Sequence, residues 1–564
     1  MMDDGLRFVA LGGVGEIGLN CYLYGAEGRW MMVDLGIGFP ENDVPGAELL
    51  VPDLAFVEAE RAHLAGLVLT HAHEDHLGAV PYLWRRLECP IWCSPFAAAV
   101  LRRKFEDMRL EPPPVTVVEP GERFEVGPFG CRFVHVTHSI PEANALVIET
   151  RFGRILHTGD WKLDPAPLVG TTTDIPTLEA LGHDGVLAVV ADSTNIMVPG
   201  TSGSEAEVRD SLARLIADQP HRVAVTTFSS HIARLRSAAL AGRAAGREVV
   251  VVGRSIRRML DAAQECGYLD DLPRLRDEHE ARDLPRERTL MLVTGSQGEP
   301  RSALVRIAQG QHPRVRLEEG DTVIFSSKII PGNERTLFEL HNRLVLAGIE
   351  VITEEDHFVH VSGHPCREEV EQLYRWLRPR IVVPVHGEPR HLHAHVLFAR
   401  RQGIAHAPWI RDGEVLRLAP GDPVVVDTVP TGRRVVENGD FLPESDELFR
   451  ARRRLEHHGA IFVSVVLDRW GSVLAPPTLS NAGAVPAERF DPRLEELSDA
   501  VVRAIEALED RAVLEDEKVR EAARIAVRQT LGLPRQKRPI VDVAITRVTP
   551  EVLAALEEEP QELR

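Results

Sequence analysis

"VLTHAHEDHLGAV", residues 68–80, sets three histidines and two acids directly behind an apolar run. His71 and His73 are two positions apart on a turn, so both side chains can face one point. Asp75 and His76 follow directly and can face a second, neighbouring point. Imidazoles and carboxylates crowded at the end of a strand carry a desolvation cost unless they bind something. The stretch predicts a metal site, and an exposed histidine-rich turn is the alternative for this segment taken alone.

The same pattern, an apolar run that ends in polar residues, recurs along the chain. Further examples are "RWMMVDLG" (29–36), "RFVHVTHS" (132–139), "GRILHTGDWK" (153–162), "VLAVVADSTN" (186–195) and "RIVVPVHGE" (380–388). Such runs are typical of strands buried on both faces, which requires helices packed on the sheets. Stretches with helical periodicity lie between them, at 79–88, 204–218, 231–246 and 365–378. The class is therefore α/β, and the polar groups fall at the carboxyl ends of strands, where such sheets place their sites.

Length and composition limit the organisation of the chain. With 564 residues it exceeds what one hydrophobic core supports. A Pro/Gly-rich stretch at 419–443 reads as a linker. Beyond it, two amphipathic helices flanked by the strand candidates "AIFVSVVLDRWGSVL" and "RPIVDVAITRV" predict a small separate α/β domain from about residue 450.

Charge and hydropathy exclude some classes of protein. A net charge of −20 argues against binding polyanions through the overall field, although a local basic channel is compatible with it. No apolar run reaches the roughly 18 residues of a membrane span. The N-terminus lacks the sections of a secretory signal, and the six cysteines are scattered, mostly inside apolar runs. We expect a cytoplasmic protein with buried thiols and no membrane association.

Gly13, Gly15 and Gly18 have the spacing of a dinucleotide-binding turn. That fingerprint needs a helix to open within the motif so that its N-terminus can hold the pyrophosphate. Here "LNCYLYG" follows and reads as a second strand. A tight glycine-rich hairpin is favoured over a nucleotide site.

More ligand candidates lie at the other strand ends. A catalytic site with two divalent ions needs roughly seven protein ligands, one of them a bridging carboxylate. His138, Asp160 and His386 extend the four of the first motif, and mixed imidazole and carboxylate donors suit zinc or manganese better than calcium. Asp34 and Glu74 remain to orient the ligands. The other histidine pairs, interpreted as solvated, are His391 with His395 and His457 with His458.

These residues together resemble a known superfamily. Asp34, "HAHEDH", His138 and Asp160 are similar to the motifs of the metallo-β-lactamase superfamily. "ADSTN" (191–195), "HVSGH" (360–364) and "PVHGE" (384–388) look like the three extra motifs of its β-CASP nucleic-acid branch. "GVGEIG" (13–18), "FPE" (39–41), "THSIPE" (137–142) and "HTGDWK" (157–162) resemble the bacterial ribonuclease J family, with the tail matching in layout more than in motif.

The resemblance implies a metallo-β-lactamase αββα sandwich with an inserted β-CASP α/β domain and a small C-terminal α/β domain. The expected parts are a lactamase-like domain at 1–206 and 366–420, the β-CASP domain at 207–365, a linker at 421–449 and the C-terminal domain at 450–564. The site would lie in the cleft between the first two domains.

It also implies how the ligands are shared. One ion would be held by His71, His73, His138 and Asp160, and the other by Asp75, His76, His386 and the shared Asp160. His386 favours RNA, because DNA-processing relatives carry valine at that motif. Zinc is expected, with manganese as the alternative. Relatives also have a structural cation, calcium or magnesium, near the "FPE" loop, and Glu437 falls near that place.

Family members bind the RNA 5′ monophosphate in a pocket that maps to Ser229, Ser230 and His231 and to His360, Val361, Ser362, Gly363 and His364. From the residues alone, "FSSH" opens a helix and "HVSGH" precedes one, so hydroxyls, imidazoles and helix N–H groups could converge on an anion. The alternative is that the two serines merely cap the helix near His231.

The expected function is that of a two-metal ribonuclease, with 5′→3′ exonuclease activity on 5′-monophosphorylated RNA and endonuclease activity, in RNA maturation and decay. Asp75, His364 and Asp192 are the catalytic candidates, with His364 as proton donor oriented by Asp192. Expected partners are RNA, further copies in a homodimer or homotetramer built through the C-terminal domain, and RNA-decay or ribosome-associated proteins. The alternatives are a lactamase-fold hydrolase of another ester or phosphodiester, and an RNA-binding subunit with a weak site.

Overall fold

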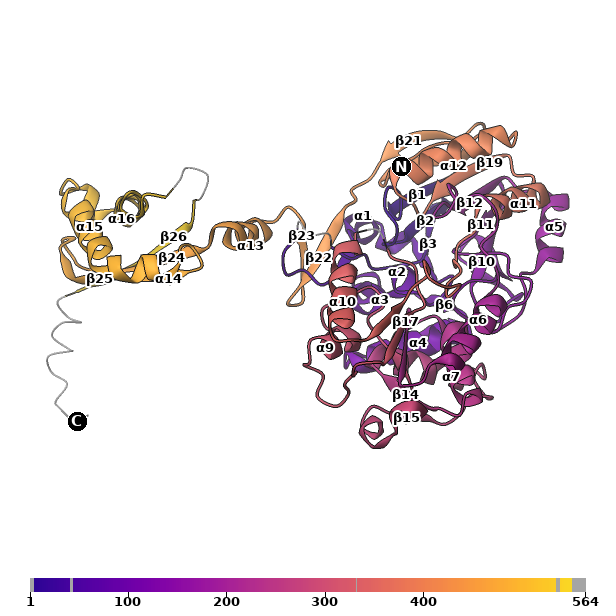
Figure 1. The fold of residues 1–564 in the computed structure, drawn as a ribbon. Helices are drawn as coiled ribbons and strands as arrows, with labels where there is room; N and C mark the ends of the chain where they lie inside the picture. Colours follow the sequence, from indigo (N-terminus) through magenta and orange to yellow (C-terminus); the bar gives the residue numbers. More distant parts are fainter. Residues whose placement is uncertain (1–4, 41–43, 331, 534–537, 550–564) are drawn as a thin grey trace. The chain divides into compact units, whose positions relative to one another are not determined.

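The computed structural model describes residues 5–40, 44–330, 332–533 and 538–549. It divides into two compact units, one made of Met1–Phe39 and Glu48–Phe441, the other of Pro40–Ala47 and Leu442–Arg564 (Figure 1). Among the described residues, no helix is long and apolar enough to cross a membrane.

Two sheets form the centre of the first unit. The larger has the order β21-β20-β1-β2-β3-β5-β6-β7, and the smaller has the order β19-β12-β11-β10-β9-β8. The strands of the larger sheet are β1 (Leu6–Gly12), β2 (Cys21–Ala26), β3 (Arg29–Val33), β5 (Leu64–Val68), β6 (Ile91–Cys93), β7 (Val115–Val117), β20 (Glu414–Ala419) and β21 (Val424–Thr428). Those of the smaller are β8 (Arg123–Val126), β9 (Phe129–His135), β10 (Asn144–Thr150), β11 (Gly153–His157), β12 (Ala188–Asp192) and β19 (Ile381–Val385).

Alternate residues of these strands enter different cores. In β1, Phe8 and Ala10 belong to a core that also contains Phe133 and Ile148 of the smaller sheet, so the two sheets face each other there. The intervening Val9 packs in a second core with residues of the helices outside the larger sheet. Because side chains alternate along a strand, a strand covered on both faces reads as a continuous apolar run.

Helices cover both outer faces. Outside the larger sheet lie α1 (Ala55–Ala59), α2 (Glu74–Leu77), α3 (Val80–Leu87) and α4 (Pro95–Asp107). Outside the smaller sheet lie α5 (Ile175–Asp184), α11 (Arg367–Leu377) and α12 (Pro389–Arg401). The layers are helix, sheet, sheet, helix, which confirms the predicted αββα sandwich.

A third sheet is inserted between β12 and β19, which pair in parallel with each other. All its strands are parallel, in the order β15-β14-β16-β13-β17-β18. They are β13 (Val223–Thr226), β14 (Glu248–Val252), β15 (Leu275–Asp277), β16 (Thr289–Val293), β17 (Thr322–Phe325) and β18 (Glu350–Ile352). The helices are α6 (Glu205–Asp218), α7 (Ile232–Ala244), α8 (Arg254–Glu265), α9 (Ala303–Ala308) and α10 (Glu334–Leu346).

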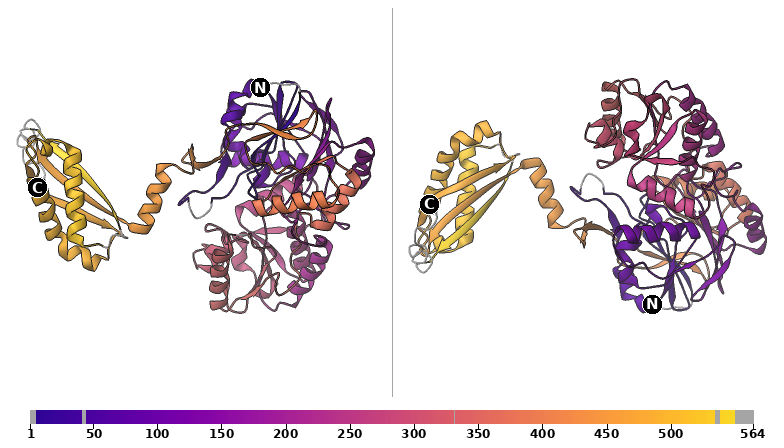
Figure 2. Two further views of the ribbon diagram at one scale, coloured as in Figure 1. Left: turned by 90° about the horizontal axis from the view of Figure 1, so that it is seen from above. Right: turned by 90° about the horizontal axis from the view of Figure 1, so that it is seen from below.

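This inserted domain forms its own lobe beside the sandwich (Figure 2). Helices α4 and α8 join the two, because Arg102 and Arg103 both pair with Glu265, and Arg258 pairs with Asp107. The predicted inserted α/β domain is therefore present.

The stretch interpreted as a linker carries short strands. Besides β21 it contains β22 (Arg433–Glu437) and β23 (Asp440–Pro443), and β22 pairs with β4 (Leu50–Pro52). The chain after the inserted domain therefore returns to the edge of the sandwich before it leaves the first unit.

The second unit has the predicted α/β character. It contains α13 (Glu447–His458), β24 (Ala460–Asp468), β25 (Val473–Ala482), α14 (Ala487–Phe490), α15 (Leu494–Glu506), α16 (Asp516–Leu531) and β26 (Ile540–Val548). The sheet order is β25-β24-β26, and α15 and α16 share its core. Alternate residues of β24 point away from this core, and among them Phe462 is 47% exposed.

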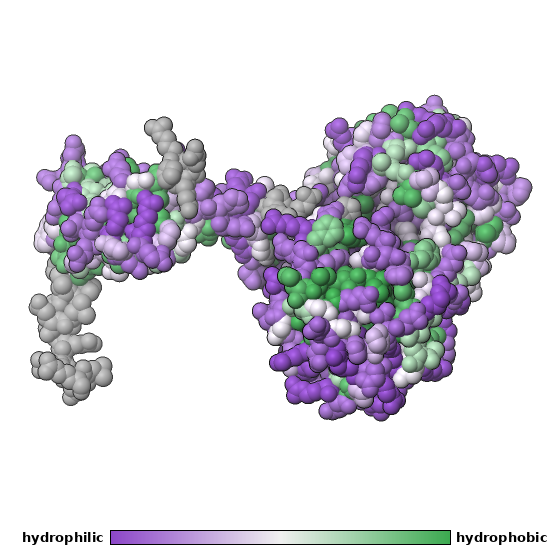
Figure 3. Space-filling model, viewed as in Figure 1, coloured by the Kyte–Doolittle hydropathy of each residue, from purple (hydrophilic) through white to green (hydrophobic). Residues whose placement is uncertain are grey.

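Hydrophilic residues dominate the face of the molecule shown in Figure 3, with hydrophobic residues gathered in the region of α10. This helix exposes Phe338, Val345 and Leu346, the last at 87%.

Candidate metal centre

The predicted ligands lie at neighbouring strand ends of the sandwich. His71, His73, Asp75 and His76 follow β5, with His73 at the N-cap of α2. His138 follows β9, Asp160 follows β11, and His386 follows β19. The structure brings them into two clusters, whose ligand atoms lie within 4.8 Å of one another. One is His71, His73, His138 and Asp160, and the other is Asp75, His76, Asp160 and His386.

Asp160 belongs to both clusters, and its side chain is buried. Its Oδ2 atom lies 3.9 Å from His71 Nε2 and 3.8 Å from His138 Nε2. On the other side it lies 3.2 Å from His76 Nε2 and 3.6 Å from His386 Nε2. A single carboxylate oxygen between two groups of imidazoles is the arrangement of a ligand that bridges two ions.

Hydrogen bonds on the outer side of the first cluster fix its imidazole tautomers. Thr70 Oγ1 donates to Asp34 Oδ2 at 2.8 Å, so at 3.0 Å it accepts from His71 Nδ1. His138 Nδ1 donates to the Gly363 carbonyl at 2.6 Å. Both Nε2 atoms therefore present lone pairs to Asp160. Burial lowers the pKa of His71 and His138 well below the usual range and that of His73 to about 4, which keeps these rings neutral and able to bind a cation.

The second cluster is held in the same way. His76 Nδ1 donates to Asp34 Oδ2 at 2.7 Å, and His386 Nδ1 donates to Asn20 Oδ1 at 2.8 Å. An imidazole that gives its N–H to an oxygen acceptor and turns its other nitrogen inward is the usual state of a metal-binding histidine. The donor set and its tautomers thus fit two divalent ions of the zinc or manganese type.

Of the two acids expected to orient ligands, the structure brings one to the cluster. Asp34 is fully buried and accepts from His76 and from both the N–H and the hydroxyl of Thr70. Glu74 instead accepts from Lys104 Nζ with both carboxylate oxygens, at 2.7 and 2.6 Å.

His364 and Asp192 stand beside the clusters. His364 Nδ1 lies 2.8 Å from Asp192 Oδ2, and its ring stacks on that of His386 at 5.5 Å. Burial opposes protonation of His364, but the carboxylates of Asp192 and Asp160 outweigh it and raise its pKa to about 9. The residue can therefore carry a proton at neutral pH, as a general acid requires.

A buried chain of hydrogen-bonded side chains ends at Ser193 and Ala191, the residues on either side of Asp192. Tyr374 OH contacts His395 Nε2 at 2.5 Å, and His395 Nδ1 contacts Ser193 Oγ at 2.8 Å. Ser193 Oγ donates to the Ala191 carbonyl at 3.4 Å. Every donor hydrogen in this series has an acceptor only if Tyr374 donates to His395, His395 donates to Ser193, and Ser193 donates to the Ala191 carbonyl. The interpretation of His391 and His395 as solvated was wrong, because they are 8% and 0% exposed.

The residues expected to bind a 5′ phosphate lie around the start of α7 and before α11. His231 is the N-cap of α7, since its Nδ1 accepts from the Arg234 N–H, and its Nε2 lies 3.2 Å from Glu205 Oε1. The helix is thus capped by His231, and the half-buried Ser229 and Ser230 precede the cap. This leaves the alternative of capping by the serines without support.

The other part of the expected phosphate site, residues 360–364, contacts the metal ligand His138. His360 Nδ1 is buried and has no hydrogen-bond partner among the residues that the structure describes. Val361 is buried, and Ser362 Oγ accepts from Asn195 Nδ2 at 2.7 Å and from the His364 N–H at 3.1 Å. Gly363 bonds to His138 through its carbonyl, and a Cβ there would lie 2.9 Å from the His138 ring.

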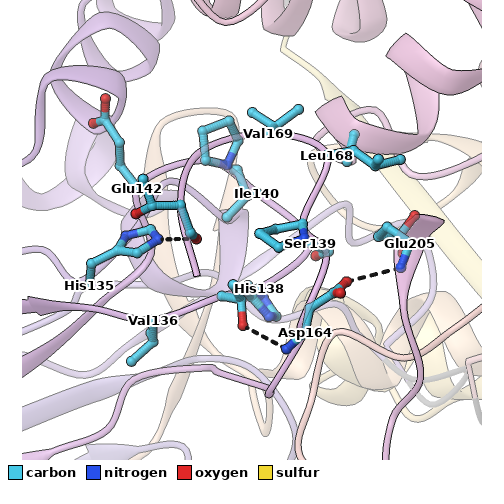
Figure 4. A pocket seen from close by; sticks show the side chains of 15 residues that line it. His135, Val136, His138, Ser139, Ile140, Glu142, Asp164, Leu168, Val169 and Glu205 are labelled. Atoms are coloured by element: carbon cyan, nitrogen blue, oxygen red, sulfur yellow. Dashed lines mark hydrogen bonds between the residues drawn. The ribbon is translucent and has the colours of Figure 1, made fainter. Parts of the chain in front are cut away.

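A pocket opens next to His138, lined by residues 135–142, by part of 164–171 and by Glu205 (Figure 4). Its carboxylates are engaged within the protein. Asp164 accepts from the Glu205 N–H at 2.9 Å, and Glu142 accepts from the Phe96 N–H and the Tyr268 hydroxyl.

Glu437, the candidate for a structural cation, lies half-buried in β22. No cation-binding group found among the described residues includes it. Glu41 of the "FPE" loop lies outside the described residues.

An αββα sandwich with a histidine- and aspartate-rich centre at its strand ends, interrupted by a parallel α/β domain, defines a metal-dependent hydrolase of the metallo-β-lactamase class. Residues 14–224 match the family "Metallo-beta-lactamase superfamily" and residues 220–344 match "Ribonuclease J, beta-CASP domain". Residues 348–404 match "Zn-dependent metallo-hydrolase RNA specificity domain", and residues 448–548 match "Ribonuclease J C-terminal domain".

Curated relatives match over nearly the whole chain. Proteins named Ribonuclease J are 44% identical in Sinorhizobium meliloti, over 97% of this chain and 98% of the relative, and 37% identical in Mycolicibacterium smegmatis, over 96% and 97%. The chain belongs to the ribonuclease J family. A crystal structure of a protein of unknown function from Enterococcus faecalis V583 covers 75% of this chain and 100% of its own, with a TM-score of 0.50 and 14% identity, and shows the fold alone.

Proposed function

We propose that this chain is a two-metal ribonuclease that removes nucleotides successively from the 5′ end of 5′-monophosphorylated RNA and also cleaves RNA internally, in RNA maturation and decay. The observation that carries the proposal is the position of Asp160 Oδ2 between two pairs of imidazoles, His71 and His138 on one side and His76 and His386 on the other. Each of the four donates its Nδ1–H to an oxygen on the outer side of the clusters. Membership of the ribonuclease J family supports RNA as the substrate.

His71, His73, His138 and Asp160 would hold one ion, and Asp75, His76, His386 and Asp160 the other, with zinc favoured and manganese the alternative. When bound, such ions lower the pKa of water and neutralise charge on a phosphodiester. His364 donates a proton to the departing 3′ oxygen, and Asp192 holds its ring. The products are a 5′ phosphate and a 3′ hydroxyl. Asp75, whose side chain is 27% exposed, is more open to solvent than the shared Asp160, whose side chain is 3% exposed.

The 5′ phosphate would bind between Ser229 and Ser230 and the segment from His360 to His364. Two observations support this. The cap of α7 is His231, which leaves both serine hydroxyls available, and His360 presents a buried, unpartnered Nδ1. His231, held by Glu205, would act by fixing the N-terminus of α7. A phosphate site at a fixed distance from the ions accounts for successive removal of nucleotides.

We infer the domain bounds to be those expected from the sequence, with the β-CASP domain at 207–365 between the lactamase-like parts 1–206 and 366–420. The insertion between the paired strands β12 and β19 supports this division. A linker at 421–449 and a C-terminal domain at 450–564 complete it. A structural calcium or magnesium ion near Glu437 belongs to the same proposal.

The partners would be RNA and further copies of the chain. The exposed sheet face of the second unit, with Phe462 and Leu474, supports a homodimer or homotetramer built through the C-terminal domain. The exposed apolar side chains of α10 offer a surface to RNA-decay or ribosome-associated proteins. The cytoplasm is the proposed location, and the free, mostly buried cysteines suit a reducing compartment.

One RNA prepared with a 5′ monophosphate, a 5′ triphosphate or a 5′ hydroxyl tests the proposal. Digestion with added Zn²⁺ or Mn²⁺ and mapping of the product ends should show rapid stepwise loss of 5′ nucleotides from the monophosphate RNA alone. Internal cuts should occur on all three. Equal exonuclease rates on the three ends would reject the phosphate site, and activity on a generic ester without any on RNA would reject the function.

A further inference from the structure

The glycine-rich segment 12–20 connects β1 to β2 as a hairpin, which confirms that it does not open a helix. Gly13, Gly15 and Gly18 have φ angles of +84°, +96° and +97°, which side-chain-bearing residues rarely adopt. The segment thus has the spacing of a nucleotide-binding turn but lacks the helix N-terminus that such a turn supplies. Its contacts point to another task.

Main-chain hydrogen bonds join this loop to the residues around His386. The His386 N–H donates to the Gly13 carbonyl at 2.6 Å, and the Gly15 N–H donates to the Gly387 carbonyl at 3.0 Å. Val14 and Glu16 also form isolated β-bridges with Gly387. His386 has a φ of +52°, in the left-handed region that few non-glycine residues occupy. The loop therefore holds a ligand that is distant in the sequence in an uncommon backbone conformation.

Asn20 continues these contacts with its side chain, which is fully buried. Its Oδ1 accepts from His386 Nδ1 at 2.8 Å and from the Tyr22 hydroxyl at 2.6 Å. Its Nδ2 donates to the Asp75 carbonyl at 3.0 Å and lies 3.3 Å from Asp75 Oδ2. Nδ2 also lies 2.9 Å from His76 Nε2. One amide thus contacts three ligands of the second cluster, although 366 positions separate it from His386.

Gly13 makes this arrangement sterically feasible. A Cβ at this position would lie 2.4 Å from the Tyr22 hydroxyl oxygen and 2.7 Å from Asn20 Oδ1. Both distances are too short for real atoms, so a side chain here would displace the amide. Glycine is required by the Asn20 network as well as by the backbone.

We propose that residues 12–20, with Asn20 at their centre, are a clamp that assembles the second metal site and leaves the first site independent. The inference rests on the proposed two-metal function. The clamp bonds to His386 and Asp75, which belong to the second cluster, whereas His71 and His138 of the first cluster are held by Thr70 and Gly363.

Titration of the full chain, stripped of metal, with Zn²⁺ against a chromophoric chelator tests the clamp. The wild type should bind two ions. In Asn20→Ala the first ion should bind as in the wild type and the second about 10–100-fold more weakly, the usual effect of removing a group that orients a ligand. Tyr22→Phe should weaken the second ion in the same direction but less.

The matched control is Tyr24→Phe. Tyr24 is equally buried, lies two residues from Tyr22, and bonds through its hydroxyl to His157 rather than to Asn20. It should leave the affinity for both ions unchanged. Gly13→Ala, which crowds Asn20 from the other side, should reproduce the selective loss, and it keeps the test decisive if Asn20→Ala does not fold.

Unchanged affinity for the second ion in Asn20→Ala and Gly13→Ala overturns the clamp. Equal weakening of both ions overturns it as well, because it would show a general effect on the fold. A wild type that binds one ion overturns the two-metal function, and the clamp with it, which distinguishes that failure from the other two.

Discussion

His364 Nδ1 lies 2.8 Å from Asp192 Oδ2, and this pair joins the end of the inserted domain to the carboxyl end of β12. The proposed proton donor and the carboxylate that holds its ring thus come from two different lobes. Its ring also lies against two predicted metal ligands, His138 and His386.

Replacing His364 by alanine should slow turnover by about 10²–10⁴-fold, the usual contribution of a general acid, with both ions still bound. Single-turnover cleavage of 5′-monophosphorylated RNA and metal analysis of the purified variant measure the two effects. Asp192→Asn, which keeps the shape of the side chain, should lose less. Loss of an ion from His364→Ala would instead make this residue a ligand.

Replacing Asp34 by alanine should weaken both ions by about 10–100-fold. Its carboxylate serves one imidazole in each cluster, since it accepts directly from His76 and, through the Thr70 hydroxyl, supports His71. The chelator titration described for Asn20 measures the two affinities. Glu74→Ala is the control, because Glu74 bonds to Lys104. An effect confined to one ion would contradict the shared role of Asp34.

Replacing Tyr374 by phenylalanine should destabilise the first unit by about 1–3 kcal/mol, the cost of leaving a buried acceptor unsatisfied. In the hydrogen-bonded series that runs from Tyr374 to the Ala191 carbonyl, the Tyr374 hydroxyl is the group that donates to His395 Nε2, and the variant lacks it. Burial lowers the pKa of His395 to about 4, so the ring stays neutral and Nε2 remains an unsatisfied acceptor. Urea unfolding followed by tryptophan fluorescence measures the change. The half-exposed Tyr82, replaced in the same way, should have a much smaller effect.

The stability of the inserted domain should fall in acid because of Glu205. Arg234 pairs with it at 2.6 and 2.9 Å and, together with His231, outweighs burial to hold the pKa of Glu205 well below its usual range. A pKa lower in the folded than in the unfolded state stabilises the fold fully above about pH 4.3, and that contribution is lost as the pH falls through the folded value.

Glu205→Gln tests this dependence. At pH 7 it should cost about 3–5 kcal/mol, because it leaves the fully buried Arg234 without its partner. Urea midpoints between pH 7 and pH 3 should then fall less steeply in the variant than in the wild type. Parallel curves would mean that Glu205 does not titrate in this range.

The candidate ligands could be predicted from the sequence because each follows an apolar run, and buried strands end where polar residues begin. His71, His138, Asp160 and His386 are all of this kind. Their anchoring groups could not be predicted. Asn20 and Thr70 are ordinary residues within or beside strands, and their partners are set by the packing of segments distant in the chain. The spacing of residues around Asn20 in the sequence does not predict its hydrogen bond to His386.

The burial of His395 also could not be predicted from the local sequence. The spacing of "HLHAH" places His391 and His395 on one face of a helix, but the packing of α12 against the smaller sheet decides whether that face is buried. "HLHAH" itself contains no acid, so the sequence favoured solvent exposure. The buried partners, Tyr374 and Ser193, come from α11 and from the end of β12.

The place of β19 at the edge of its sheet affects the order in which the enzyme is made. This strand, which carries His386 at its end, pairs with β12 but is synthesised only after the whole inserted domain. A ribosome that has not yet passed residue 386 therefore holds a chain without a complete second cluster. Under the proposed mechanism the growing nuclease cannot cut the message or the ribosomal RNA beside it before residue 386 of its 564 residues has been made.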